Sequence, residues 1–400
     1  MSKVKIRDIR VINTNPAGAN LTIVKVETTE PSLYGLGCST FTYRYKAVTL
    51  MVEEYLKPLL VGRDVANIED LWQLMNANSY WRSGPVTNNA ISGIDMALWD
   101  IKGKMANMPV YDLLGGKSRE GVAVYRHADG KTFEEVLENV LKFQQEGVRH
   151  IRIQFGGYGG KAKKMNIPLN SPEGVYYCPY EYVDNTLKLF EYIRSKVGFD
   201  IELLHDTHER LAPIEAVKLA KNLEQYRLFF LEDVLSPEQS DWFKIIRQQC
   251  STPIAMGELF VDFKQWDYLI SNRLIDFIRC HISDIGGLTP ARKLAVFGEQ
   301  FGVRTAWHGP GDVSPIGHTA NVHLDLNAHN FGIQEWAGFN DTLKEVFPGC
   351  PELKNGYVYA NDKPGFGIDI DEKLAAKFPC NDNVTKWTQT RLPDGTYNRP

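Results

Sequence analysis

The chain has 400 residues, of which 43% are hydrophobic and 24% charged, and its formal net charge is -4 at pH 7. This length predicts two domains, or one large α/β domain with additions. This net charge argues against a nucleic-acid partner, since nothing in the sequence resembles a basic stripe. No apolar run approaches the roughly 20 residues that a membrane-spanning helix needs.

The six cysteines are scattered and form no CxxC pair. This usage favours reduced thiols in a cytoplasmic protein over a disulfide framework or a zinc site. The opening stretch MSKVKIRD has no apolar signal-peptide region. We therefore expect a cytoplasmic protein whose partner is a small molecule, with neither nucleic acid nor membrane as a partner.

The first 117 residues show strand patterns followed by helical patterns. Alternating apolar and polar residues predict a hairpin over 4–15 and 20–29, joined by the turn-rich PAGAN. Helical periodicity then follows over 46–62, 67–81 and 88–107. The glycines of LLGGK close the segment, so residues 1–117 are predicted to form an α+β domain.

From residue 118 onward, short apolar or β-branched runs alternate with helical patterns. The runs cover residues 121–126, 150–155, 200–206, 228–233, 253–258, 276–282, 303–308 and 331–336. Eight strands alternating with helices over about 250 residues predict a (β/α)8 TIM-type barrel over 118–365, although the link before residue 331 has a weak helical pattern. A doubly wound sheet also alternates, but it usually has fewer strands, and no GxGxxG follows the first run. Residues 366–400 are predicted to pack back on an earlier element.

One connection is unusually long. Residues 156–182, between the second and third predicted barrel strands, are rich in Gly, Pro, Tyr and Lys. A long irregular loop in a compact domain is usually functional or disordered. This loop leaves the carboxyl end of a barrel strand, where barrel active sites are built.

Three carboxylates follow three successive predicted strands at a constant spacing of 26 residues: Asp206, Glu232 and Glu258. Their side chains should converge at one end of the barrel and repel one another unless a cation or a proton neutralises them. Oxygen ligands without cysteine favour a hard cation such as Mg²⁺. Any single one of the three acids could be explained as a helix N-cap. Three acids at equivalent positions on successive strands instead favour a metal site.

Other polar residues fall on the remaining strand ends, namely Arg152, Arg279, His308 and Glu335. Arg279 lies inside an apolar run, where a guanidinium needs an anionic partner. Two roles fit Arg279 equally well at this stage: a structural ion pair, or a contact with a substrate carboxylate. His308 could be a satisfied core histidine, but its place at a strand end favours a functional role.

Two groups of motifs resemble the enolase superfamily over nearly the whole chain. Residues 92–116, SGIDMALWDIKGKMANMPVYDLLGG, resemble the signature of its capping domain, and Asp206, Glu232 and Glu258 resemble its metal triad. The stretches HDTHER, FLEDV, GELF, DFIRCH, AWHGPGD and WTQTRLPDG are similar to the mannonate dehydratase subgroup, in the branch named after a bacterial starvation-sensing protein.

The resemblance implies an Mg²⁺-dependent dehydratase of six-carbon acid sugars of the D-mannonate or D-gluconate type. In that chemistry the metal stabilises the enediolate formed when the proton next to the carboxylate leaves, and the product is a 2-keto-3-deoxy sugar acid. His208 would protonate the departing 3-hydroxyl. The implied substrate contacts are Thr42, His127, Glu258, Arg279, His308 and Glu335. A homo-oligomer is also implied.

The base departs from the subgroup pattern. The subgroup uses a tyrosine on the loop after the second strand, paired with an arginine that matches Arg152, but the expected position 164 is a lysine here. Tyr158 is the nearest candidate, and four other tyrosines, Tyr176, Tyr177, Tyr180 and Tyr182, lie on the same loop. At the position of Thr42, subgroup members contact a sugar hydroxyl with a different side chain. The resemblance therefore does not identify the sugar.

Two alternatives to the dehydratase remain. The first is a metal-binding family member with little or no turnover, acting as a sensor or regulatory binder. The second is a racemase or epimerase, which would use a strand-seven histidine paired with an aspartate at strand six. His281 occupies that second position, which weakens the racemase hypothesis.

Overall fold

The computed structural model describes residues 4–159, 166–382 and 387–399. The described chain divides into two compact units. The first holds the described residues of 1–123, 259–266 and 279–382, and the second holds those of 124–258, 267–278 and 383–400. The predicted domain boundary after residue 117 stays a prediction.

The first unit begins with a three-stranded antiparallel sheet. Its strands are β1 (Ile6–Thr14), β2 (Leu21–Thr28) and β3 (Tyr34–Cys38), in that order. Pairing of Val11 with Val24 confirms the predicted hairpin. The sequence pattern does not reveal β3, because the two glycines of YGLGC weaken a strand signal.

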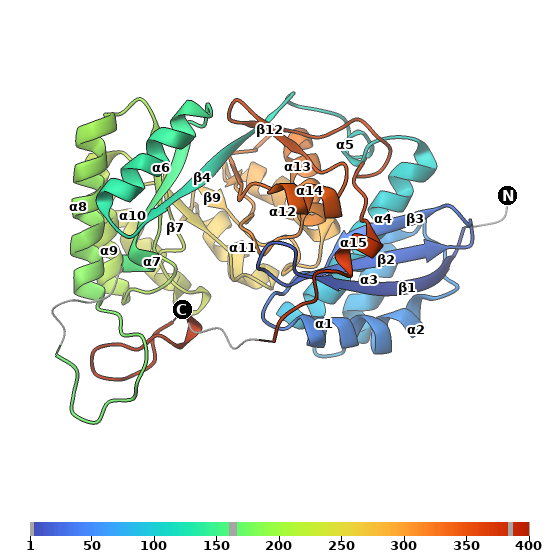
Figure 1. Ribbon diagram of the computed structural model, residues 1–400, viewed down its shortest axis with the longest axis horizontal. Coiled ribbons are helices and arrows are strands. Elements are labelled where there is room, and N and C mark those ends of the chain that lie inside the picture. Colours follow the sequence, from blue (N-terminus) through green and yellow to red (C-terminus); the bar gives the residue numbers. More distant parts are fainter. Residues whose placement is uncertain (1–3, 160–165, 383–386, 400) are drawn as a thin grey trace. The chain divides into compact units, whose positions relative to one another are not determined.

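Helices follow this sheet in the chain. They are α1 (Tyr45–Leu50), the π-helical η1 (Met51–Leu56), α2 (Lys57–Leu60), α3 (Ile68–Asn78), α4 (Pro85–Ala106) and α5 (Val110–Leu113). The long helix α4 lies against β3 (Figure 1). This approach requires glycine, since a Cβ at Gly37 would lie 1.9 Å from the carbonyl oxygen of Gly93.

The rest of the first unit comes from the C-terminal half of the chain. Its elements are α12 (Leu288–Gln300), β10 (Arg304–Thr305), α13 (Pro315–Asn327), β11 (Gln334–Glu335), α14 (Asp341–Val346), the hairpin of β12 (Glu352–Lys354) and β13 (Tyr357–Tyr359), and α15 (Glu372–Ala375). The weak helical pattern before residue 331 corresponds to α13, a regular helix. It is buried on nearly all sides, so it lacks the polar stripe that marks a surface helix.

The second unit contains six consecutive parallel strands. They are β4 (Val122–Gly130), β5 (His150–Phe155), β6 (Glu202–Asp206), β7 (Phe230–Glu232), β8 (Ile254–Met256) and β9 (Phe277–Ile278), hydrogen-bonded in chain order. Together with β10 and β11, every one of the eight predicted barrel strands is present, which confirms the predicted alternation.

Helices alternate with these strands. They are α6 (Phe133–Gln145), α7 (Gly156–Gly159), α8 (Pro179–Val197), α9 (Pro213–Leu223), η2 (Glu224–Tyr226), η3 (Pro237–Trp242), α10 (Phe243–Gln249), α11 (Phe263–Ser271) and the terminal η4 (Trp387–Gln389). The neighbours α8 and α9 lie side by side (Figure 1). None of the described helices is both long enough and apolar enough to cross a membrane.

Candidate active site and metal centre

Three carboxylates lie at the ends of three successive strands of the second unit. Asp206 is the last residue of β6, Glu232 is the last residue of β7, and Glu258 follows β8 by two residues. Asp206 and Glu232 are direct partners in the parallel ladder. Both are buried, with 1% and 0% of their surface exposed, whereas the side chain of Glu258 is 20% exposed.

Arg152, on β5, carries the positive charge that faces two of these carboxylates. Its Nη1 lies 3.2 Å from Oδ2 of Asp206 and 3.0 Å from Oε1 of Glu232. The hydroxyl of Tyr125 donates a 3.0 Å hydrogen bond to Oε2 of Glu232. Two buried carboxylates that share one cationic donor need positive charge at this place. Their all-oxygen donor set also fits a hard cation such as Mg²⁺.

His208 lies in a left-handed turn just beyond β6. Its φ is 52° and that of Glu209 is 59°, a conformation that costs a non-glycine residue roughly 1–2 kcal/mol. The His208 amide donates a 2.7 Å hydrogen bond to Oδ1 of Asp206, and its Nε2 lies 3.9 Å from Oε1 of Glu258. The strand ends at Asp206, so this turn, and not alternation along a strand, places His208 near the first and third carboxylates.

Glu209 is a buried acid that the sequence pattern does not single out. Burial, reinforced by the charges of Asp233 and Glu258, raises the pKa of Glu209 to about 9. The raised pKa favours the neutral form of this side chain. The sequence HDTHER does not distinguish Glu209 from a solvent-exposed acid, because its raised pKa results from burial, which the sequence does not show.

His127 belongs to the same group through Arg152. It lies on β4, and its Nδ1 is 3.1 Å from Nη2 of Arg152. Since a guanidinium only donates, Nδ1 accepts, and the neutral ring carries its proton on Nε2. The structure thus brings three predicted site residues, His127, Asp206 and Glu232, around the guanidinium of a fourth, Arg152.

The tyrosines of the loop after β5 differ in their surroundings. The side chain of Tyr158 and all of position 164 lie outside the described part of the chain. Tyr182 is buried, and its hydroxyl lies 2.7 Å from Nε2 of His205. Burial raises the pKa of both Tyr177 and Tyr182, which makes either phenol a poor base. Tyr176 donates to the carbonyl of Pro172 at 2.7 Å, and Tyr180 is 74% exposed.

Arg279 and Glu335, both in the first unit, form a buried ion pair. Nη2 of Arg279 lies 2.7 Å from Oε2 of Glu335, and the two side chains are 0% and 1% exposed. The same carboxylate oxygen accepts the Gly309 amide at 2.9 Å. Gly309 follows His308 directly, so the ion pair also fixes the backbone beside that histidine.

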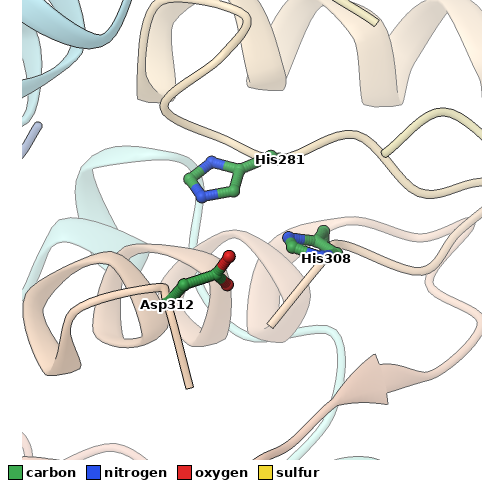
Figure 2. A group of neighbouring side chains, drawn as sticks. All are labelled: His281, His308 and Asp312. Carbon is green, nitrogen blue, oxygen red and sulfur yellow. The ribbon is translucent and has the colours of Figure 1, made fainter. Parts of the chain in front are cut away.

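His308 lies in a cluster with His281 and Asp312. Each of the three offers a potential metal-ligand atom, and these atoms lie within 4.8 Å of one another. Figure 2 shows the two imidazole rings and the carboxylate directed toward a common point, and the ring centroids are 5.2 Å apart. Asp312 is a residue that the sequence analysis does not single out, because it lies in a loop after β10 and only the structure brings it near His281, 31 residues earlier in the chain.

The tautomer of His281 argues against a three-ligand metal site in this cluster. The Ser283 amide donates a 3.1 Å hydrogen bond to Nδ1 of His281, so the neutral ring carries its proton on Nε2. A metal-binding imidazole instead binds through one nitrogen and donates a proton from the other. The arrangement is better suited to hydrogen bonding, with His281 as a donor and the Asp312 carboxylate as an acceptor.

Thr42 lies in the turn before α1. Its hydroxyl donates a 3.2 Å hydrogen bond to the carbonyl oxygen of Asn20, and the residue is half-buried. This contact lies within the first unit. A contact of Thr42 with a sugar stays a prediction.

Two family patterns match the chain. The pattern described as mandelate racemase / muconate lactonizing enzyme, N-terminal domain, matches residues 3–115, and the one described as enolase C-terminal domain-like matches residues 135–374. The match places the chain in the fold with an N-terminal capping domain and a C-terminal α/β barrel domain of the TIM type, as the sequence predicts.

Several proteins resemble the chain over its full length. A D-galactonate dehydratase family member from Salmonella virchow is 55% identical, and one from Enterococcus gallinarum is 52% identical, each over 100% of both chains. A solved structure of an enolase from Pantoea ananatis, with bound D-gluconate and Mg, is 55% identical, covers 99% of this chain and 100% of its own, and has a TM-score of 0.97. The 3,6-anhydro-D-galactonate cycloisomerase from Zobellia galactanivorans is 27% identical over 94% and 99%, with a TM-score of 0.80.

Proposed function

The chain belongs to the D-galactonate dehydratase family of the enolase superfamily, and we propose that it is an Mg²⁺-dependent dehydratase of six-carbon acid sugars. The product would be a 2-keto-3-deoxy sugar acid. The bound D-gluconate and Mg of the Pantoea ananatis enolase support this class of substrate and this metal.

The metal would be held by Asp206, Glu232 and Glu258. Two of these carboxylates are buried beside one guanidinium, in a place where a second positive charge is favourable. Bound Mg²⁺ would stabilise the negative charge that develops on the substrate carboxylate when the α-proton leaves. Glu258, which is more exposed than the other two, can also reach substrate.

The placement of His208 is the observation that carries the proposal. Its amide is bonded to the first carboxylate, and its imidazole lies near the third. A protein that only binds a metal has no need for a titratable imidazole held in a costly left-handed turn between two ligands. His208 would donate a proton to the 3-hydroxyl, which then leaves as water.

Tyr158 is proposed as the base, with Arg152 as the paired arginine that the subgroup pattern implies. A tyrosine acts as a base only when its phenol ionises, and a nearby guanidinium favours the phenolate. The burial of Tyr177 and Tyr182 disfavours these two alternatives, because it raises their pKa. Arg152 would then serve both the carboxylates and the base.

Substrate contacts are proposed for Thr42, His127, Arg279, His308 and Glu335. To these we add Asp312, because its carboxylate is directed toward the rings of His281 and His308 (Figure 2). Histidine donors and a carboxylate acceptor together suit a hydroxyl group, which both donates and accepts. This polarity fits a polyhydroxylated acid.

The test is a screen of the Mg²⁺-loaded protein against six-carbon acid sugars, beginning with D-gluconate and D-mannonate. The expected result is formation of a 2-keto-3-deoxy acid that requires Mg²⁺ and is lost in His208→Asn. Tight binding of an acid sugar without product would instead support the sensor or regulatory binder. Exchange of the α-proton with solvent without loss of water would support a racemase or epimerase.

A further inference from the structure

Asp233, the residue after Glu232, connects the ends of three strands. Its amide donates a 3.0 Å hydrogen bond to the carbonyl of Ala255 on β8, and its carbonyl accepts the Glu209 amide at 2.8 Å from the turn after β6. Asp233 is buried, with 2% of its surface exposed. It therefore continues the hydrogen bonding past the point where the regular ladder β6-β7-β8 ends.

The side chain of Asp233 makes a second set of contacts toward Glu258. Its Oδ1 accepts the Gly257 amide at 3.0 Å and lies 3.4 Å from the amide nitrogen of Glu258. Backbone amides that donate to a carboxylate are charge-assisted bonds, roughly twice as strong as neutral ones. The backbone of Glu258 is thus held at two successive amides by a side chain from the neighbouring strand.

The backbone of Asp233 is itself in a costly conformation. Its φ is 41°, in the left-handed region that only Gly, Asn and Asp enter with any ease. Gly257, whose amide it binds, has a φ of 134°. Persistence of such conformations requires surrounding contacts that over-determine them, and they cluster at functional sites.

We propose that Asp233 is a positioning residue, which fixes the backbone of Glu258 through Oδ1 and the turn of His208 and Glu209 through its carbonyl. The inference rests on the proposed metal-binding role of Glu258. Asp233 itself would touch neither metal nor substrate. Its function would be to hold the third carboxylate, Glu258, and the proposed acid, His208, at a fixed position relative to each other. Each of the two follows a different strand, and no regular ladder joins them.

Two substitutions separate the acceptor from the backbone conformation. Asp233→Asn keeps an Oδ1 acceptor and tolerates the left-handed region, whereas Asp233→Gly tolerates that region but has no acceptor. We would measure Mn²⁺ binding by electron paramagnetic resonance for the wild type and both variants. Asp233→Asn should bind within about threefold of the wild type, and Asp233→Gly should bind at least about tenfold more weakly.

A double-mutant cycle separates this positioning from general loss of structure. Placed in a Glu258→Gln background, Asp233→Gly should change Mn²⁺ affinity by less than about twofold, because the ligand through which it acts is already impaired. Should Asp233→Gly lack the native circular dichroism spectrum, Asp233→Ser replaces it, since its hydroxyl is too short to reach both amides. The added strain of Ser in the left-handed region is then measured separately, as the free energy of unfolding in urea.

The outcomes are distinct. Equal Mn²⁺ affinity of the wild type and Asp233→Gly would overturn the inference about Asp233 without contradicting the proposed metal site. An equal loss of affinity in both backgrounds would also overturn it, because the effect would then not run through Glu258. A wild-type protein that binds no Mn²⁺ would overturn the proposed metal site, and the inference with it.

Discussion

The amide of His208 and the carboxylate of Asp206 are joined by a 2.7 Å hydrogen bond, so the proposed acid and the first proposed metal ligand share one turn. A single carboxylate thus has two functions. Its charge faces Arg152, 3.2 Å away, and its Oδ1 holds the backbone of His208 in the left-handed region. These two functions can be separated by substitution.

Asp206→Asn should remove the charge and keep the turn. Its amide oxygen can still accept the His208 amide, so Mn²⁺ affinity should fall by about 100-fold or more while the fold remains stable. Asp206→Ala removes both functions, and its free energy of unfolding in urea should fall by about 1–3 kcal/mol relative to Asp206→Asn. Equal stability of the two variants would show that the turn does not depend on Asp206.

Replacing Arg152 tests whether the buried carboxylates need a cation. Arg152→Met leaves Asp206 and Glu232 without their shared donor, and breaking a buried ion pair in this way costs about 3–5 kcal/mol. We expect the metal-free variant to unfold at lower urea concentration. Mg²⁺ should restore more stability to Arg152→Met than it adds to the wild type, because it supplies the missing positive charge.

Arg152→Lys is the matched control for that prediction, since it keeps the charge and loses the second guanidinium nitrogen that reaches His127. Its metal-free stability should lie between those of the wild type and Arg152→Met. If Arg152→Met were as stable as the wild type without Mg²⁺, the carboxylates would not depend on the guanidinium for charge balance.

His205 should make the stability of the protein depend on pH. Its ring is buried between the carbonyl of Ile153 (2.9 Å) and the hydroxyl of Tyr182 (2.7 Å), and burial lowers the pKa of His205 to about 4. In the unfolded chain this histidine has its ordinary pKa of 6.5 and therefore binds more protons between pH 4 and 6.5. The stabilisation is therefore complete above pH 6.5 and is lost as the pH falls toward 4.

Between pH 7 and pH 5, this one histidine should account for a loss of about 2 kcal/mol in the free energy of unfolding. Denaturant unfolding of His205→Gln at both values should show a correspondingly smaller loss. The exposed His329→Gln serves as the control and should keep the wild-type dependence. An unchanged pH dependence in His205→Gln would contradict the prediction.

The sequence predicts the strands of the barrel segment well because each is a short apolar run between turn signals, and each predicted run contains a strand. It predicts α13 poorly for a physical reason: a helix buried on all sides has no polar face, so its periodicity is faint. The hairpin of β12 and β13 is also missed, because three-residue strands give too few alternations to recognise.

The same contrast holds at the site. The 26-residue spacing of Asp206, Glu232 and Glu258 is visible in the letters, because it repeats the length of one strand-helix unit. Asp312 and Asp233 are not visible in this way. Their partners, His281 for the first and the amides of Gly257 and Glu258 for the second, are set by loop conformation and positive φ values, which no residue periodicity encodes.

The glycines of WHGPGD provide the last prediction. A Cβ at Gly309 would lie 2.3 Å from the carbonyl oxygen of Glu335, whereas no atom lies within 4 Å of a Cβ at Gly311. Gly309→Ala must displace the strand end that carries Glu335, and overpacking of this kind typically costs about 1–3 kcal/mol. It also disturbs the bond from the Gly309 amide to Oε2 of Glu335 and so moves the backbone beside His308.

We therefore expect Gly309→Ala to lower both the free energy of unfolding and kcat/KM for the acid sugar, with a loss of activity of about tenfold or more. Gly311→Ala, two residues away in the same loop, should leave both within about twofold of the wild type. Urea unfolding and steady-state kinetics on the two variants provide the comparison. Similar losses in both would indicate a general sensitivity of the loop, and an unaffected Gly309→Ala would show that the contact with Glu335 does not position His308.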